Sequence, residues 1–380
     1  MTIVKIIYLR NKLKKTSGLL LLIILSASLI SCLSTKKTIH RKTSDIRNIV
    51  LMIGDGMGLP AVSAAMTVSD HPLNIERCNV IGLQKTNSAD RYITDSAAAG
   101  TALATGNKTN NGVIGMDSQG IRVKSILEIA EEQGLSTGLV STASVTHATP
   151  ASFIAHQLSR GSYEDIALDF LKTDIDVFIG GGYDHFAKRK DNLNLIDSLK
   201  IRGYEIDTAI NEILKSTASK LAGLTAPVHN PYRLKGRGDM LAASSGKAIE
   251  ILNKNPNGFF LMIEGSQIDW AGHANSADTL IDETLDFDRA VGVVLDFAQK
   301  DGHTLVVIAA DHETGGITII GGDKDTHKVK LNFSTKDHTA VMVPVYAYGP
   351  GAEKYNGVYE NTSVFQKFMS SFGFGQLKQK

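Results

Sequence analysis

Short apolar runs alternate along the chain with stretches in which apolar residues recur at helical spacing. The run at residues 48–53 is apolar, rich in β-branched side chains and followed by Gly54, which is typical of a strand buried on both faces. Comparable runs predict five more strands, at residues 137–141, 176–179, 259–263, 304–309 and 341–347. Between them the spacing predicts helices over residues 123–133, 162–171, 193–201, 240–252 and 277–299.

This alternation predicts the fold class. Strands that alternate with helices favour an α/β fold, here a three-layer α/β/α sandwich with a large, mostly parallel central sheet. One domain is expected over residues 48–376, with surface loops near 226–238 and 321–338 as insertions in it. In such folds functional residues gather just beyond the carboxyl ends of the strands, so a site is sought there.

The first 31 residues have the pattern of an export signal. Five basic residues precede an apolar run at 19–30, whose twelve residues fall short of the about 20 that a membrane-spanning helix needs but suit the core of a signal peptide. The run ends at Leu29-Ile30-Ser31-Cys32, which resembles a bacterial lipobox, a signal for lipidation of the cysteine. A plain secretory peptide with an incidental Cys32 is the alternative.

The lipobox interpretation predicts a processed, exported protein. Residues 1–31 would be removed and residues 32–47 would form a lipidated cysteine and a polar tether. The protein would then be periplasmic or anchored to a membrane of a bacterial cell envelope. With Cys32 lipidated, Cys78 would have no partner for an intrachain disulfide, and we expect it to be a small buried residue.

Composition and charge exclude other classes of protein. Of the 380 residues, 43% are hydrophobic and 21% are charged, which indicates a globular chain and not a disordered one. The formal net charge is +1, and loss of residues 1–31 leaves 35 basic against 39 acidic residues, a net charge of −4. Neither value suits a nucleic-acid-binding protein.

Two strand ends carry residues with more than one interpretation. Asp55 lies between glycines after the first predicted strand, where it could serve a turn alone. Ser96 precedes a run of small residues that suits a closely packed helix. A serine there can be a helix N-cap, but the same place gathers backbone N–H groups that favour an anion, so a nucleophile fits equally well.

Acids and imidazoles at further strand ends indicate a metal site. Glu264 closes an apolar strand, where an unpaired charge would be costly, and Asp269 and His273 follow it. Asp311-His312 directly follows another apolar run, and His338 precedes the last one. Carboxylate and imidazole are ligands for divalent cations, and four strand ends that carry them together favour metal binding.

Five motifs, taken in order, resemble the alkaline phosphatase family. The match as a whole runs from about residue 48 to residue 372, and several motifs in the right order are far more specific than one. The motifs are Gly54-Asp55-Gly56-Met57-Gly58, Thr94-Asp95-Ser96-Ala97-Ala98-Ala99-Gly100-Thr101-Ala102, Thr146-His147-Ala148-Thr149-Pro150, Glu264-Gly265-x-x-Ile268-Asp269 and Ala310-Asp311-His312-Glu313-Thr314-Gly315-Gly316. The resemblance implies an alkaline-phosphatase-like fold and metal-dependent hydrolysis of phosphate monoesters (EC 3.1.3.1).

The resemblance also implies a role for each matching residue. Ser96 would be the nucleophile that forms a phosphoserine, Asp95 would hold Arg160, and Arg160 would bind two phosphate oxygens. Two Zn²⁺ and one Mg²⁺ are implied per chain. The first zinc would be held by Asp269, His273 and His338, the second by Asp55, Asp311, His312 and Ser96, and the magnesium by Glu264, Thr149 and Asp55.

Two positions depart from the enterobacterial pattern of this family. His147 stands where that pattern has Asp near the magnesium, and Trp270 stands where it has Lys near the phosphate. With a histidine at the first position the chain resembles animal and some marine bacterial members, and with a tryptophan at the second it resembles some marine members. We expect the two residues to affect magnesium binding and phosphate release, respectively.

The residue types support this chemistry independently. A serine hydroxyl is a poor nucleophile that metal coordination can ionise, and two divalent ions about 4 Å apart can each serve one apical oxygen of an in-line displacement. An arginine offers the planar pair of donors that fits a phosphate. Because each of these groups would contact the phosphate, broad tolerance of the leaving group is expected.

The partners follow from this interpretation, and two alternatives stay open. The substrates would be small phosphate monoesters, the lipid at Cys32 would join the chain to a membrane, and a homodimer is left open. A phosphodiesterase of the same superfamily and a non-catalytic, lipid-anchored metal- or phosphate-binding protein are the alternatives. The modified Cys or Ser followed by Pro and Arg that a sulfatase needs is not found around Ser96.

Overall fold

The computed structural model describes residues 45–375. The predicted signal peptide, Cys32 and the tether as far as residue 44 lie outside the described residues, as does residue 376. Cys78 is buried and is the one free cysteine in the described part of the chain, as expected from the sequence.

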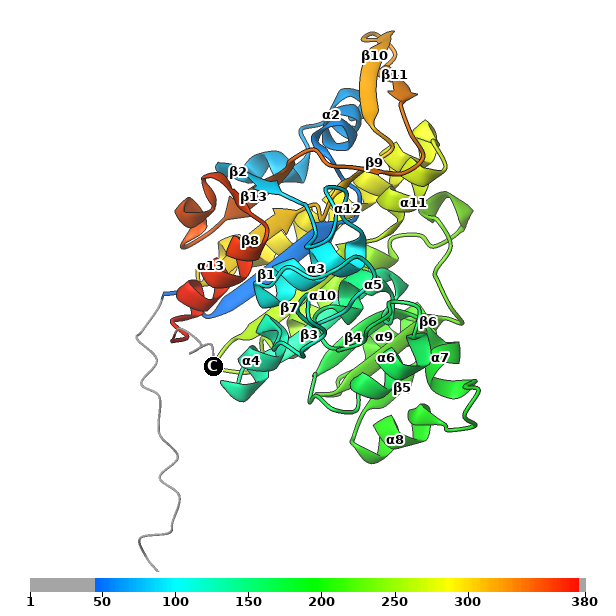
Figure 1. Cartoon of the computed structure of the whole chain (residues 1–380), viewed down its shortest axis with the longest axis vertical. Coiled ribbons are helices and arrows are strands. Elements are labelled where there is room, and N and C mark those ends of the chain that lie inside the picture. Colours follow the sequence, from blue (N-terminus) through cyan, green and yellow to red (C-terminus); the bar gives the residue numbers. More distant parts are fainter. Residues whose placement is uncertain (1–44, 376–380) are drawn as a thin grey trace, which may run out of the picture. The chain divides into compact units, whose positions relative to one another are not determined.

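Within residues 45–375, ten strands form one sheet in the order β14-β2-β13-β8-β1-β7-β3-β4-β6-β5 (Figure 1). Neighbouring strands are parallel, except that β13 is antiparallel to both of its neighbours. The strands are β1 (Asn48–Gly54), β2 (Val80–Lys85), β3 (Ser136–Ser144), β4 (Val177–Gly181), β5 (Glu205–Asp207), β6 (Leu221–Ala226), β7 (Phe259–Gly265), β8 (Thr304–Ala309), β13 (Val343–Tyr348) and β14 (Gly357–Glu360).

Side chains of β1 alternate between two hydrophobic cores, one on each face of the sheet. Ile49, Leu51 and Ile53 belong to one core, and Val50 and Met52 belong to the other, because successive side chains of a strand point to opposite faces. The first core includes residues of α3 (Ser96–Thr105), α4 (Ile126–Glu132), α5 (Ala148–Ala151), α6 (Tyr163–Asp169), α7 (Tyr183–Ala187), α8 (Leu195–Ile201) and α13 (Thr362–Phe372). The second includes residues of α2 (Leu59–Val68), α9 (Ile210–Lys215), α10 (Met240–Leu252), α11 (Gln267–His273) and α12 (Ala277–Asp301). Helices therefore cover both faces, which confirms the α/β fold with a mostly parallel central sheet.

Each predicted strand and helix overlaps an element of the structure, and the boundaries follow local signals. Helix α4 begins after Ser125, whose hydroxyl accepts from the Glu128 N–H while Glu128 accepts from the Ser125 N–H. Helix α12 ends at Asp301 and is followed by Gly302, which has a φ of 71°, the left-handed conformation that glycine adopts without strain. Of the ten strands of the central sheet, β2, β5, β6 and β14 were not predicted.

The two predicted surface loops have more structure than the sequence indicated. Most of 321–338 belongs to an exposed antiparallel hairpin of β10 (Ile317–Asp323) and β11 (Lys328–Phe333), which stands at the top of Figure 1. Segment 226–238 begins at the end of β6 and contains a short 3₁₀ helix, Arg233–Lys235. Arg237 in that segment is buried, so the segment is not only a surface loop.

The sheet order brings the chemically important strand ends together. Strands β8, β1, β7 and β3 are consecutive neighbours, and their carboxyl ends lead to Asp311, Asp55, Glu264 and Ser144. A small sheet of β9 (Glu313–Thr314) and β12 (His338–Thr339) brings His338 beside the end of β8. None of the helices described combines the length and the hydropathy of a membrane span.

Candidate active site and metal centre

Within the described residues, three groups of acids and histidines have ligand atoms that all lie within 4.8 Å of one another. All the residues in these groups were named as candidate site residues from the sequence. They are Asp269, His273 and His338; Asp55, Asp311 and His312; and Asp55, His147 and Glu264. Asp55 belongs to two of them, so the groups are contiguous.

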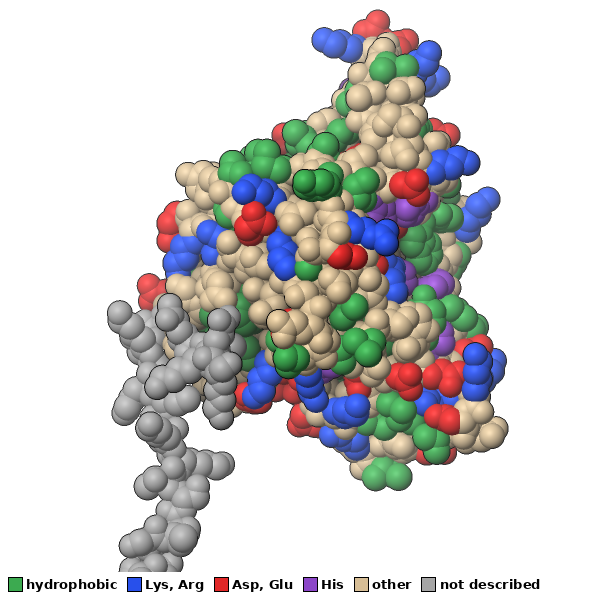
Figure 2. Space-filling view, in the orientation of Figure 1, with side chains coloured by type: hydrophobic (Ala, Val, Ile, Leu, Met, Phe, Trp, Pro, Cys, Tyr) green, Lys and Arg blue, Asp and Glu red, His purple; other side chains and the backbone are tan. Residues whose placement is uncertain are grey.

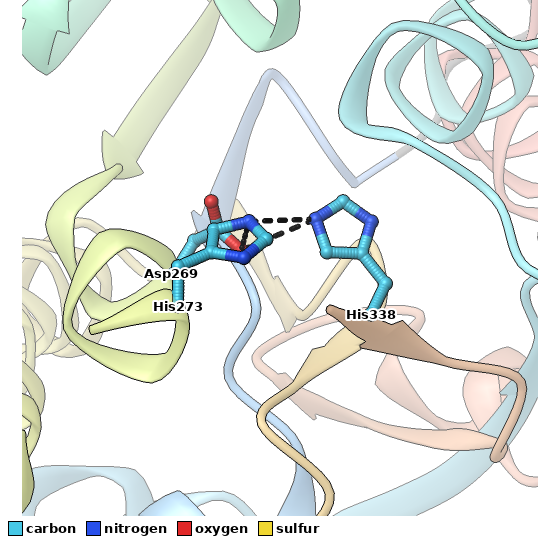
Figure 3. Close-up of side chains that lie close together, drawn as sticks. All are labelled: Asp269, His273 and His338. Atoms are coloured by element: carbon cyan, nitrogen blue, oxygen red, sulfur yellow. Dashed lines mark hydrogen bonds and ion pairs between the residues drawn. The ribbon is translucent and has the colours of Figure 1, made fainter. Parts of the chain in front are cut away.

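The first group combines one helix and one short strand (Figure 3). Asp269 and His273 lie one turn apart on α11, and His338 faces them from β12. The Nε2 atoms of the two histidines are 3.2 Å apart, and each is 3.4 Å from Asp269 Oδ1. The Nδ1 atoms of His273 and His338 are bonded to the carbonyl oxygens of Lys336 and Thr94, so each Nδ1 carries a proton.

This geometry fits a cation. With both Nδ1 atoms protonated, the two Nε2 lone pairs and a carboxylate oxygen converge on one place, which requires a proton or a metal ion between them. The hydrogen bond to Asp269 raises the pKa of His273 to about 9. Burial lowers the pKa of His338, but Asp269 outweighs burial and raises it above its usual value. Asp269 therefore holds a positive charge at this place.

The second group is completely buried. His312 Nε2 lies 3.4 Å from Asp55 Oδ1 and 3.3 Å from Asp311 Oδ2. Asp311 Oδ1 accepts from the N–H groups of Gly56 and His312, but Oδ2 has no hydrogen-bond partner among the described residues. Burial, and then the neighbouring carboxylates of Asp311, Asp269 and Glu264, raise the pKa of Asp55 well above its usual value. A divalent cation would satisfy the unpartnered oxygen and offset this repulsion.

The third group lies on the far side of Asp55. Glu264 Oε2 accepts from the Ser141 hydroxyl at 2.6 Å, whereas Glu264 Oε1 and His147 Nδ1 are buried without a partner among the described residues. Burial raises the pKa of Glu264 to about 7 and lowers the pKa of His147 to about 3. Thr149 donates to Asp55 Oδ2 at 3.4 Å, so its hydroxyl borders the group. Buried oxygen and nitrogen atoms that have lone pairs and no hydrogen-bond partner again suit the binding of a cation.

Ser96 lies beside the second group at the start of α3. Its Oγ is 3.4 Å from Asp55 Oδ1 and 3.3 Å from His312 Nε2. The N-cap of α3 is Asp95, whose Oδ1 accepts from the Ala98 N–H, so capping does not occupy the Ser96 hydroxyl. The small residues of α3 allow it to pack closely against α5. A Cβ on Gly100 would lie only 2.9 Å from the hydroxyl of Ser152, the residue that follows α5.

Arg160 is held beside Ser96 by Asp95. Asp95 Oδ2 accepts from Arg160 Nη1 at 2.9 Å and from the Gly112 N–H at 3.0 Å. Burial lowers the pKa of Arg160, but the Asp95 carboxylate outweighs it and raises the pKa further, so the guanidinium is charged. Arg160 Nη2 lies 3.4 Å from His147 Nε2.

An open cavity of about 860 Å³ joins these groups to the surface. Its size suits a small molecule, and it lies below the β10–β11 hairpin, where histidine side chains reach the surface in Figure 2. The lining includes Ser96, Arg160, His147, Trp270, His273 and His338, with Arg91, Tyr92, Ile93, Thr94, Asp95, Asn111, Asp269 and Asp337. The residues predicted from the five motifs thus lie at this cavity or directly beneath it.

Sequence reasoning missed several residues that support the site. Thr314 donates to Asp269 Oδ1, and the buried Glu313 accepts from Thr339, next to His338. His229 packs edge-on against Trp270, with ring centroids 4.9 Å apart. Thr314 and Glu313 lie inside a quoted motif, which is a signal for them, but His229 lies in a segment without one.

Comparisons with known proteins agree with this arrangement. The sequence model of the family "Alkaline phosphatase" matches residues 46–332. Alkaline phosphatase 4 of Bacillus subtilis is 37% identical over 84% of this chain and 87% of its own length, and the Escherichia coli alkaline phosphatase is 32% identical over 86% of each. The solved alkaline phosphatase of the Antarctic bacterium TAB5 is 42% identical, with a TM-score of 0.83 over 88% of this chain and 99% of that one.

One of these relatives bears on the metals. A histidine-to-aspartate variant of the TAB5 enzyme is described with Mg bound in its M3 site. Each comparison covers most of both chains, and the buried acids and histidines form metal-binding groups in this chain too. The chain belongs to the alkaline phosphatase family and is a metal-dependent phosphomonoesterase.

Proposed function

We propose that Ser96 is the nucleophile and that the reaction passes through a phosphoserine. Ser96 Oγ would attack the phosphorus of a monoester as the bond to the leaving alcohol breaks. Water would then attack the phosphoserine, release inorganic phosphate and restore the hydroxyl. The observation that carries this proposal is the place of Ser96 Oγ, which lies 3.4 Å from Asp55 Oδ1 and 3.3 Å from His312 Nε2.

Arg160 would bind the phosphoryl group during both steps. Its side chain lines the cavity with Ser96, and Asp95 fixes Nη1, so the guanidinium is already oriented before substrate binds. Two coplanar donors match two phosphate oxygens, and Ser96 lies in the first turn of α3, where free backbone N–H groups favour an anion. These contacts stabilise charge on the phosphoryl oxygens, where it spreads in the transition state.

We further propose two Zn²⁺ and one Mg²⁺ per chain. Mixed carboxylate and imidazole ligands suit zinc at Asp269, His273 and His338 and at Asp55, Asp311 and His312 with Ser96. Oxygen ligands from Asp55, Thr149 and Glu264 suit magnesium, and His147 in the same group is expected to weaken it. Bound zinc would supply Lewis-acid stabilisation of the attacking and leaving oxygens and lower the pKa of water.

A trapping experiment tests the role of Ser96. Wild-type protein incubated with ³²P-labelled phosphate and quenched in acid should retain label on Ser96. Ser96→Ala should retain none even with zinc and magnesium in excess, because Asp55, Asp311 and His312 remain to hold the second zinc. Normal turnover of an aryl phosphate by Ser96→Ala would overturn the proposal, and preference for an aryl phosphodiester would favour the superfamily alternative.

We also propose that the mature protein starts at Cys32 and is a lipid-anchored protein of a bacterial cell envelope. Support comes from the basic segment, the apolar run and the Leu29-Ile30-Ser31-Cys32 sequence, and from the start of the described domain soon after the polar tether. Cells that express the chain should incorporate labelled palmitate into the wild type and not into Cys32→Ser. Light scattering on the mature chain tests whether it forms a homodimer.

A further inference from the structure

Helix α11 carries Asp269, Trp270 and His273, but its first residue, Gln267, makes no contact with the cavity. Gln267 is 1% exposed, and its amide is bonded on both sides. Nε2 donates to the carbonyl oxygens of Thr142 near the end of β3 and of Asn230, at 3.2 and 2.7 Å. Asn230 lies in segment 227–238, the part of segment 226–238 that follows β6. Oε1 accepts from Arg237 Nη1 at 2.9 Å.

Arg237 is anchored in turn to α12. Its side chain is 1% exposed, and it donates to Glu283 and, at 2.8 Å, to Asp286, two acids that are themselves buried. Arg237 Nη1 donates to Gln267, to Glu283 and to the Pro231 carbonyl oxygen, so both of its hydrogens are engaged. A buried arginine paired with two acids and bonded to an amide has one orientation, which fixes Gln267 as well.

The same segment contacts α11 at a second place. His229 packs edge-on against Trp270 and lies 5.7 Å from the ring centroid of His147. His229 Nδ1 accepts from the Ser144 N–H at 3.1 Å, which orients the ring. Segment 227–238 thus connects α12 and the end of β3 to both the start and the middle of α11.

We propose that Gln267 and Arg237 are positioning residues, and that segment 227–238 sets the place of α11 and so the spacing of Asp269 and His273 from His338. This inference rests on the metal-binding role proposed for that group. Asp269 and His273 reach the group from a helix of only seven residues, and their partner His338 is on a separate strand. A small rotation of α11 would therefore separate the ligand atoms of Asp269 and His273 from that of His338, which now lie 3.2–3.4 Å away.

Trp270 provides a readout that does not depend on activity. It is the one tryptophan in the chain and sits between Gln267 and His273 on α11, so its fluorescence reports the environment of that helix. Gln267→Met keeps the side-chain volume and removes the three hydrogen bonds. Arg237→Lys keeps a buried positive charge for the acids of α12 but cannot bind two acids and Gln267 in one plane.

The experiment compares zinc-loaded full chains. Gln267→Met and Arg237→Lys should both increase acrylamide quenching of Trp270 and weaken zinc binding about 10–100-fold in a chelator competition, the usual effect of losing an outer support. Excess zinc should restore kcat. The double variant should lose no more than the stronger single variant, because both changes break the same connection.

Asp288→Asn is the matched control. Asp288 is a buried acid of α12 that accepts from the N–H groups of Asn74 and Ile75, so its loss disturbs α12 away from α11. It should lower thermal stability without changing Trp270 quenching or zinc affinity. The inference is overturned if Gln267→Met and Arg237→Lys behave like Asp288→Asn. If the wild type bound no zinc at this group, the proposed metal role would fail, whereas the Trp270 result would still decide the positioning of α11.

Discussion

The Nε2 atoms of His273 and His338 lie 3.2 Å apart, although backbone carbonyls hold the proton of each ring on the opposite nitrogen. Two lone pairs that face one another across this distance, beside the Asp269 carboxylate, form a stable arrangement only around a positive charge. The same need recurs at Asp55, where burial, and then the neighbouring carboxylates, raise its pKa well above the usual value. The side chains of both groups are thus arranged so that a bound cation stabilises them.

Removal of the metals should therefore destabilise the fold. Chelation leaves Asp55, Asp311 and Glu264 buried beside one another without compensating charge. A ligand present at about 1,000 times its Kd stabilises a protein by about 4 kcal/mol, so the Tm should fall by on the order of 10 °C. Calorimetry before and after chelation measures this. Restoration of the original Tm by zinc and magnesium is the control, and an unchanged Tm in fully stripped protein would contradict the account.

Arg160→Ala should weaken phosphate binding and leave the metals in place. Hydrogen bonds to charged groups contribute about 1.5–3 kcal/mol, so the inhibition constant for inorganic phosphate should rise about 10–100-fold. Asp95 keeps its bonds from the Ala98 and Gly112 N–H groups, so the start of α3 should stay intact. Metal analysis of the same sample checks this. Loss of metal together with phosphate binding would show that Arg160 acts on the metal groups instead.

Trp270→Lys should slow the release of product phosphate. Trp270 lines the cavity with Arg160 and adds no charge, whereas a lysine would bring a second cation near the phosphate. A gain of about 1 kcal/mol corresponds to roughly fivefold tighter inhibition by phosphate. Trp270→Met removes the ring without adding charge and is the control. Weaker inhibition in Trp270→Lys than in Trp270→Met would refute the prediction.

Glu131→Gln should stabilise the protein more at alkaline than at acidic pH. Burial raises the pKa of Glu131 to about 7, against the opposing effect of hydrogen bonds from the Asp174 N–H and the Thr137 hydroxyl. The folded state therefore holds this proton more tightly than the unfolded state, and the ionised carboxylate reduces stability as pH rises from the unfolded pKa through about 7.

The difference between the pKa values of Glu131 in the folded and unfolded states sets how much the free energy of unfolding changes with pH. The variant should gain about 1 kcal/mol more at pH 9 than at pH 6, a difference that thermal unfolding of zinc-loaded samples can measure. Glu132→Gln, at the exposed next position of α4, is the matched control for loss of a carboxylate. A gain for Glu131→Gln that is equal at the two pH values would contradict the assignment.

The central sheet was predictable because its strands are buried on both faces. Strands β1, β7 and β8 are fully buried over their whole length, so their sequences are continuous apolar runs. Strand β2 mixes exposed and buried positions. In the hairpin of β10 and β11 only Ile317 is buried, and Val329, Leu331 and Phe333 pack against the second core from partly buried positions. None of these strands is therefore a continuous apolar run, although the alternation of polar and apolar residues in β11 is itself a strand pattern, which the prediction of a loop overlooked.

The site was predictable only as far as its local motifs extend. Asp55 and Asp311 each lie in a short pattern at a strand end, and their convergence follows from the sheet order, whereas Ser96 lies in a short pattern at the start of α3. Gln267 and Arg237 have no such pattern, because their importance comes from a contact between segments 30 residues apart in the sequence. Buried polar supports of this kind depend on tertiary packing, which a single sequence does not reveal.

Anomalous diffraction at the zinc edge from crystals of the mature protein tests the central claim most directly. The account predicts one peak among Asp269, His273 and His338 and another among Asp55, Asp311 and His312, about 4 Å apart, with Ser96 Oγ beside the second. Crystals of an active, phosphate-releasing protein that show no metal at either group would contradict it.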